Sequence, residues 1–171
     1  MSKWDCIKTY SGVYFDLLDF KQEDIHIIDI AHALSHMCRY NGHCNSFYSV
    51  AEHCIRGSKI ISSEAAPFFL LHDAAEAYLG DVVTPLKRMF PEYKEKEDML
   101  LAMIFDKFIP TPYTKDIADK IKEMDRIQLE EEMEILLTAT KPDFDCCDFT
   151  EIRQSFVNNF TGLQYAGYIK Q

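Results

Sequence analysis

The residues HDAAEAYLGD at positions 72–81 follow directly on the apolar run FFLL at positions 68–71. A histidine and an aspartate therefore enter at the end of a predicted buried segment, where a charge needs a partner or a metal ion. If the segment is helical, Glu76 stands at i+4 from His72 and at i+3 from Asp73, so the three side chains share one side of the helix. This spacing indicates a chemical site set into a folded core.

Gly80 is a natural C-terminal stop for such a helix. Its position predicts that Asp81 lies in the loop that follows, facing the same cleft as Glu76. The alternative interpretation of this stretch, taken alone, is a capped amphipathic helix with two solvated acids.

The composition limits the class of protein. With 171 residues, 47% of them hydrophobic and 27% charged, the chain is expected to form one compact globular domain. The formal net charge of −10 disfavours binding to a nucleic acid polymer or to an anionic membrane, because both attract clustered Lys and Arg. An anionic substrate is therefore expected to need a metal ion or a local arginine.

Neither a signal peptide nor a membrane span is expected. The first residues, MSKWDC, are polar and interrupted, and no apolar run approaches the roughly 18 residues of a membrane helix. Among the six cysteines, Cys146 and Cys147 form the one close pair and no C-x-x-C repeat occurs, so reduced thiols are expected rather than a zinc knuckle. The sequence thus predicts a cytoplasmic protein.

The pattern along the chain predicts an all-α fold. Residues 1–24 contain the β-rich stretch TYSGVYF and are expected to form a short extended or hairpin arm, with one helical domain over residues 25–171. Helical spacing and Gly or Pro breaks predict helices at 29–40, 46–61, 64–79, 91–108, 114–137 and 151–160, with a short turn at Pro85 and a loop at 143–148.

Two further polar residues lie within apolar helical stripes. His53 is at i+3 from Val50, and Asp125 is at i+4 from Ile121. A lone buried carboxylate would be costly, and Arg126 is too close in sequence to share the face of Asp125. A core histidine with a backbone partner remains an alternative for His53.

His53, His72, Asp73 and Asp125 therefore supply two imidazoles and two carboxylates from three predicted helices. Nitrogen and oxygen ligands without thiolate suit divalent Mn, Fe, Co, Ni or Zn with open positions for water and substrate. Such a cation lowers the pKa of a bound water toward neutrality, so the expected chemistry is hydrolysis.

Other candidates are weaker. Arg39 suits bidentate phosphate contact and Tyr40 suits stacking on a base or sugar, with His43 close behind them, although a solvated helix end is an equal alternative. His32 and His36 form an i, i+4 pair but lack the H-E-x-x-H pattern of zinc proteases.

The order His53, His72-Asp73, Asp125 resembles the H…HD…D signature of the HD-domain metal-dependent phosphohydrolases, over about residues 29–137. The segments AEH, LHDAAE, GD and TPLK are similar to bacterial 5′-deoxynucleotidases and to compact phage-encoded dATP triphosphohydrolases. The chain has Tyr40 where the bacterial enzymes have Trp.

This resemblance implies an HD-type helical bundle with one divalent metal ion (Co, Mn, Zn or Fe) bound by the four residues named above, and leaves room for Mg at a second site. It implies that Glu76 is the general acid or base and that Asp81 positions water or the leaving group. Arg39 and Tyr40 would contact substrate, and His43 and Lys87 are further candidates for substrate binding.

The expected activity is hydrolysis of a deoxynucleoside triphosphate, with dATP first, to deoxynucleoside and triphosphate. A 5′-deoxynucleotidase acting on monophosphates is the close alternative, and a cyclic-nucleotide phosphodiesterase and a non-catalytic nucleotide-binding domain are the others. The absence of a G-x-x-x-x-G-K-[ST] segment excludes a P-loop NTPase. A homo-oligomer, dimer or hexamer, is also expected, partly from helices that carry Phe68, Phe69, Phe105 and Phe108.

Overall fold

The computed structural model describes residues 6–138 and 148–171, most of them helical, and the expected all-α class is confirmed. Within these ranges the only sheet is a two-stranded hairpin. The strands are Ile7–Lys8 (β1) and Tyr14–Phe15 (β2), and the helices are Ile27–His36 (α1), Val50–Ile60 (α2), Ala66–Leu71 (α3), Glu76–Leu79 (α4), Thr84–Lys87 (α5), Pro91–Phe108 (α6), Lys115–Leu136 (α7) and Phe149–Tyr165 (α8), with 3₁₀ turns at Gln22–Asp24 (η1) and Tyr40–Gly42 (η2).

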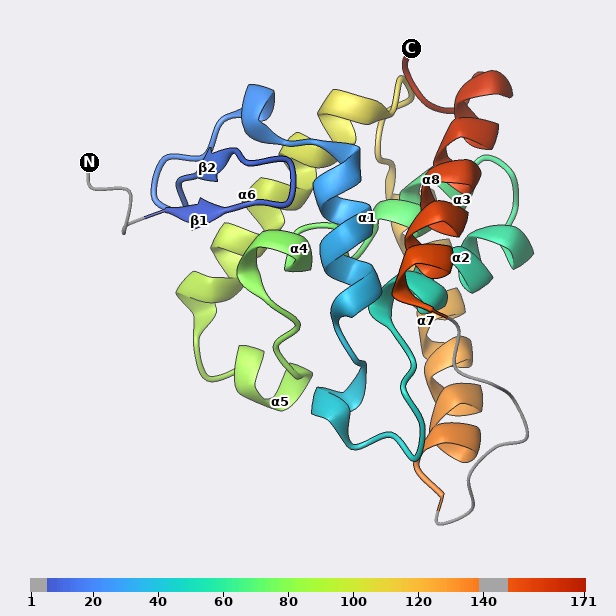
Figure 1. The fold of residues 1–171 in the computed structure, drawn as a ribbon. Coiled ribbons are helices and arrows are strands. Elements are labelled where there is room, and N and C mark those ends of the chain that lie inside the picture. The colour runs from blue at the N-terminus through green and yellow to red at the C-terminus, as the bar shows by residue number, and fades with distance from the viewer. Residues whose placement is uncertain (1–5, 139–147) are drawn as a thin grey trace.

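The N-terminal hairpin docks on the helices rather than extending into solvent (Figure 1). Its antiparallel strands pair Ile7 with Phe15, and the Phe15 ring is fully buried and stacks on Tyr78 of α4 at 4.1 Å. In the turn, the amide and hydroxyl of Ser11 both donate to the carboxylate of Asp29, at 2.6 and 2.8 Å. The expected arm is therefore anchored to α1.

Beside the hairpin, α1 packs along α8, and α2 packs along α3 (Figure 1). Gly57 lies where α2 meets α3, and a Cβ there would stand 2.0 Å from the ring of Phe69. Only glycine fits such a close approach without displacing the ring. The contact sets His53, one turn earlier on α2, over the C-terminal end of α3.

The first two helices are shorter than the sequence pattern predicts. The helix expected at 29–40 ends at His36, because the chain turns extended there and Cys38 forms a β-bridge with Ser49. The helix expected from residue 46 begins after Ser49, whose side chain accepts from the amide of Glu52 in a capping box.

The continuous helix expected at 64–79 is also wrong. It is interrupted at residues 72–75, where backbone bonds tighten from i−4 to i−3, as in Ala74 N–H to Leu71 C=O at 3.0 Å. The expected stop is correct, since α4 ends at Gly80 with a φ of 87°. The interruption turns His72 and Asp73 toward α2 and α7.

The final helix is longer than expected. It begins at Phe149, capped by the carboxylate of Asp148, and continues to Tyr165. The loop expected at 143–148, which includes Cys146 and Cys147, lies outside the described residues apart from Asp148. The cysteines among the described residues, Cys6, Cys38, Cys44 and Cys54, are free thiols.

The aromatic residues that suggested an oligomer interface are mostly core residues. Phe68 and Phe69 are fully buried, Phe105 is buried, and Phe108 packs against the same core. These side chains therefore give no argument for association, and the oligomeric state stays a prediction. Within residues 6–138 and 148–171, no helix combines the length and apolar character that a membrane crossing requires.

Candidate metal centre

Four side chains from α2, the end of α3 and α7 converge on one point. The Nε2 atoms of His53 and His72 lie 3.3 Å apart. Asp125 Oδ1 is 3.1 Å from the first of these nitrogens, and Asp73 Oδ2 is 3.3 Å from the second. The structure thus brings together all four residues that the sequence predicted as metal ligands.

In each imidazole ring, the partner of Nδ1 determines whether Nε2 has a lone pair that can bind a metal ion. His72 Nδ1 is 2.7 Å from the carbonyl oxygen of Phe69, which can only accept, so Nδ1 carries the proton. His53 Nδ1 is 2.9 Å from the carboxylate of Glu132, which likewise favours a proton on Nδ1. In the neutral rings both Nε2 lone pairs then face the same point, the arrangement that metal-binding histidines adopt.

The charges around this point favour a cation. Burial alone would raise the pKa of Asp125, but its hydrogen bond with His53 and the nearby His72 lower the pKa to about 2, so the carboxylate is ionised. For His53, burial opposes the charged ring, but hydrogen bonds with Asp125 and Glu132 raise the pKa overall. A proton on Nε2, donated to Asp125, and a metal ion at the same point are therefore alternatives. Two imidazole nitrogens and two carboxylate oxygens fit a divalent transition metal ion, and this helical chain with such a cluster fits an HD-like domain.

Cys54 lies at the back of the cluster, a residue that the sequence interpretation did not place there. Its Sγ is 3.9 Å from His72 Nδ1 and 4.0 Å from Asp73 Oδ2. Burial raises the pKa of the Cys54 thiol well above its usual range, and His72 Nδ1 is already committed to Phe69. A ligand set of nitrogen and oxygen therefore describes the site better than one with thiolate.

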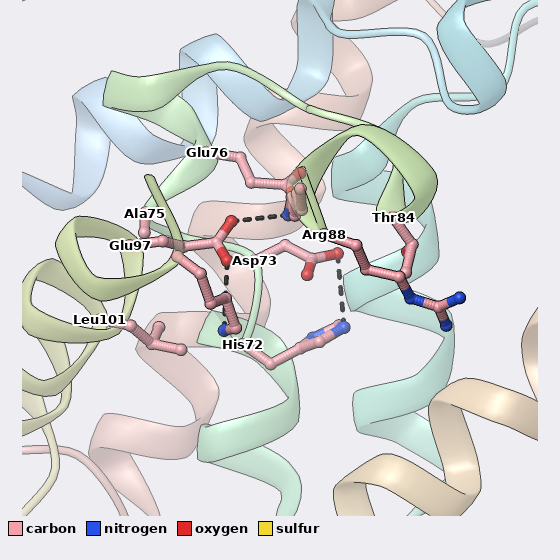
Figure 2. A pocket seen from close by; sticks show the side chains of 10 residues that line it. His72, Asp73, Ala75, Glu76, Thr84, Arg88, Glu97 and Leu101 are labelled. Carbon is pink, nitrogen blue, oxygen red and sulfur yellow. Dashed lines mark hydrogen bonds and ion pairs between the residues drawn. The ribbon is translucent and has the colours of Figure 1, made fainter. Parts of the chain in front are cut away.

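A cavity of about 370 Å³ opens beside His72 and Asp73, between α4, α5 and α6 (Figure 2). Glu76 is buried in its wall, and Lys87 Nζ donates to Glu76 at 3.0 Å and to Glu97 at 2.6 Å. Burial, with the charges of Asp73 and Asp81, raises the pKa of Glu76 to about 9, although Lys87 opposes the shift. Glu76 thus holds a proton at neutral pH when the cluster carries no cation.

Asp81 occupies the loop after Gly80, as expected. It is partly buried, and burial together with the charge of Asp73 raises its pKa. It is not among the residues that line the cavity beside Glu76. Asp81 therefore lies close enough to Asp73 for its pKa to be affected, but it does not form part of the cavity wall.

Of the predicted substrate-binding residues, Arg39 is the one that reaches the cluster. Its Nε forms an ion pair with Glu132 at 2.9 Å, and an Nη atom lies 3.9 Å from Asp73 Oδ2. The guanidinium lies 5.4 Å from the centre of the Tyr40 ring. His43, by contrast, is exposed, and its amide donates to the Tyr40 carbonyl. Lys87 is in the cavity, held by carboxylates.

Sequence interpretation missed Glu132, Gln128 and Glu97. Glu132 and Gln128 follow Asp125 at i+7 and i+3, so the three lie on one face of α7, and this polar repeat was the available signal. Gln128 Nε2 donates to the carbonyl of His53 and to Glu132, each at 2.9 Å. The sequence therefore showed the polar repeat on this face of α7, but not that these residues orient the cluster.

No protein-family model matches the chain. A stretch of 102 residues, 60% of this chain, is 45% identical to the uncharacterized protein YfdR of Escherichia coli (strain K12) and spans 57% of that protein's length. Over 146 residues, 79% of this chain, the sequence is 35% identical to the uncharacterized protein RCAP_rcc00048 of Rhodobacter capsulatus, covering 74% of it. Neither name states an activity.

Proposed function

Since this chain belongs to the same family as the uncharacterized protein RCAP_rcc00048 of Rhodobacter capsulatus, we propose a function from the site itself: a metal-dependent phosphohydrolase of deoxynucleotides. The observation that carries the proposal is the pair of opposed Nε2 atoms of His53 and His72, flanked by the carboxylates of Asp73 and Asp125, beside an open cavity. A bound Co, Mn, Zn or Fe ion would supply Lewis acidity and activate water there.

The chain's own residues have separate tasks in this proposal. Arg39, next to Asp73, offsets charge on the phosphoryl oxygens. Glu76 lines the cavity and is buried, which favours its protonated form, so it is the group that we propose donates a proton to the leaving oxygen. Lys87 holds the Glu76 carboxyl in place from α5, and Asp81 orients water or the leaving group from the loop.

The lining of the cavity favours a phosphate-rich substrate. Lys87, Arg88 and Lys94 contribute to its wall in a chain whose net charge is −10. Figure 2 shows Thr84 and Arg88 on one side and Glu97 and Leu101 on the other. Arg88, with Lys87 and Lys94 on the same wall, suits the phosphates of a nucleotide, and a deoxynucleoside triphosphate, dATP first, is the substrate that we propose.

One observation favours the monophosphate as a second candidate. Lys87 is paired with Glu76 and Glu97, and Lys94 is paired with Glu97 and Asp98. Arg88 forms no ion pair within the described ranges, so it is the cation of this wall most available to a phosphate. A 5′-deoxynucleotidase needs fewer such contacts than a triphosphohydrolase.

Product analysis tests both candidates. The protein is incubated with each of the four dNTPs and dNMPs in the presence of Co²⁺, Mn²⁺ or Zn²⁺, and the products are separated by chromatography. Deoxynucleoside with triphosphate supports the first candidate, and deoxynucleoside with phosphate from dNMPs alone supports the second.

The matched variants are Asp73→Ala, which removes a cluster carboxylate, and Asp116→Ala, which removes an exposed carboxylate of α7 that pairs with Lys120. Activity should be lost with a chelator and in Asp73→Ala but persist in Asp116→Ala. Turnover that ignores both the chelator and Asp73→Ala, or no turnover of any nucleotide, contradicts the proposal.

A further inference from the structure

Glu132 is a buried carboxylate whose two oxygens serve different partners. Its side chain is 1% exposed and lies near the middle of the C-terminal half of α7. Oε1 accepts from His53 Nδ1 and from Gln128 Nε2, both at 2.9 Å. Oε2 forms the ion pair with Arg39 Nε, also at 2.9 Å. One side chain thus touches a cluster histidine and the arginine beside the cluster.

The loop that carries Arg39 is held in a costly conformation against the same helix. Tyr40 and Asn41 have φ values of 55° and 56°, in the left-handed region that bulky residues rarely adopt. The Tyr40 hydroxyl donates to the Leu129 carbonyl at 3.3 Å and to Glu132 Oε2 at 3.4 Å. Arg39 and Tyr40 therefore take their positions from α7.

A carboxylate that served only to neutralise Arg39 would not need its second oxygen on His53. Because the two oxygens of Glu132 contact different partners, one rotamer of Glu132 sets the orientation of both the His53 imidazole and the Arg39 guanidinium. Gln128 fixes this rotamer and also binds the carbonyl of His53. The arrangement resists independent movement of the two partners.

We infer that Glu132 is a positioning residue that couples divalent-metal binding at His53 to phosphate binding at Arg39. This inference rests on the proposed function, since it assigns the ligands of the two sites. Coupling of this kind is reciprocal. Loss of Glu132 removes the carboxylate that orients both His53 and Arg39, so both affinities should weaken, including phosphate binding when no metal is present.

The experiment compares the wild type with Glu132→Gln, which keeps the shape and removes the charge. Co²⁺ affinity is measured by calorimetry without nucleotide, and dATP affinity is measured in EDTA. We expect Co²⁺ binding to weaken by about 10- to 100-fold, as for other partners of metal-bound histidines. The dATP affinity in EDTA should fall as well, and the visible spectrum of bound Co²⁺ should change.

Glu131→Gln is the matched control, because Glu131 is the neighbouring carboxylate of α7 and pairs with Arg56 at the surface. It should change neither affinity. If Glu132→Gln does not fold by circular dichroism, Glu132→Asp takes its place, since it keeps the charge but withdraws the oxygens, and it must give the same two losses.

The inference is overturned if either affinity is unaffected by the change at Glu132, if wild type binds no dATP in EDTA, or if Glu131→Gln has the same effects. Failure of the proposed function is a separate result. It would be seen as absence of nucleotide turnover by the wild type while both affinities still respond to Glu132.

Discussion

Two pairs of histidines lie in this molecule, and their surroundings are opposite in kind. His53 and His72 come from different helices and point their Nε2 atoms at each other, 3.3 Å apart. His32 and His36 lie one turn apart on α1, with ring centres 4.2 Å apart. The two rings of the second pair are tilted by 35°, and each stacks on an aromatic ring, His32 on Tyr10 at 3.9 Å and His36 on Phe149 at 4.8 Å. We call these four rings the stacked column.

The difference lies in the neighbours rather than in the imidazoles. Around His53, the carboxylates of Asp73, Asp125 and Glu132 lie within 4.0 Å. Beside His32, an Nη atom of Arg153 lies 3.5 Å from Nδ1, and the nearby carboxylate of Asp29 is occupied by Ser11. Two histidines at suitable spacing therefore make a metal site only where acids and second acceptors surround them.

The largest expected effect tests this contrast through activity. Asp125→Ala removes the carboxylate 3.1 Å from His53 Nε2. Loss of the cation's several kcal/mol of transition-state stabilisation should lower kcat/KM for the preferred nucleotide by about 1,000-fold. His32→Ala, in the stacked column, should leave kcat/KM unchanged. Steady-state kinetics with Co²⁺ measure both, and equal losses in the two variants would contradict the distinction.

The next prediction compares two buried carboxyl groups, Glu76, which we propose takes part in the reaction, and Asp29, which stabilises the fold. Glu76→Gln keeps the shape of the buried side chain but removes the proton donor, so kcat should fall by about 100-fold. Asp29→Asn alters the buried carboxylate beside His32 and weakens the hold on Ser11. It should lower the free energy of unfolding and leave kcat unchanged.

Kinetics at saturating nucleotide and urea unfolding of the same variants give the two quantities. A normal kcat in Glu76→Gln would remove Glu76 from the reaction. A kcat reduced in Asp29→Asn would show that the hairpin side of α1 contributes to catalysis.

The sequence predicted the elements whose causes are local. The apolar stripes identified the helices, and Gly80 correctly marked the end of α4. His53 and Asp125 were identified because each is a polar group in an apolar stripe, and His72 and Asp73 because they follow directly on an apolar run, where burial demands a partner. Their order also matched a known signature, so the set was predicted although its helices are far apart in the sequence.

The errors have non-local causes. Pro67 stands in the first turn of α3, where it is tolerated, and nothing in residues 68–79 breaks a helix. The interruption at 72–75 follows from packing, with His72 turned back onto the Phe69 carbonyl. The left-handed Tyr40 is unexpected for a bulky side chain, and it is held from α7. Glu132 was missed because its role depends on two residues that come to it from α2 and the η2 loop.

A smaller effect concerns stability, and it is specific to the first histidine pair. Co²⁺ at 100 times its dissociation constant should stabilise the folded wild type by about 2.7 kcal/mol. For a chain of this size, that raises Tm by about 5 to 10 °C. The shift should vanish in Asp125→Ala and with EDTA, and it should persist in His32→Ala. Thermal unfolding followed by circular dichroism measures Tm. If Co²⁺ still raises Tm in Asp125→Ala, the metal ion binds elsewhere.

The smallest expected effect concerns His32 in the stacked column, where burial and then neighbouring positive charge oppose protonation of the ring. Burial, followed by His36 and Arg153, lowers the pKa of His32 below 6.5, while Asp29 opposes the shift. The unfolded chain therefore takes up the proton first as pH falls through 6.5, so this residue makes the fold less stable toward pH 5. His32→Phe keeps a ring against Tyr10 and removes the titration.

Between pH 7.5 and 5.5, in EDTA, Tm of the wild type should therefore fall further than Tm of His32→Phe. Contributions from groups far from His32 are shared by the two proteins and cancel in the difference between the curves. If the curves run parallel, or the wild type falls less, neither burial nor Arg153 opposes a charge on the His32 ring. The column would then tolerate a charge that its aromatic and cationic neighbours are expected to oppose, and the contrast with the His53 pair would rest on the carboxylates alone.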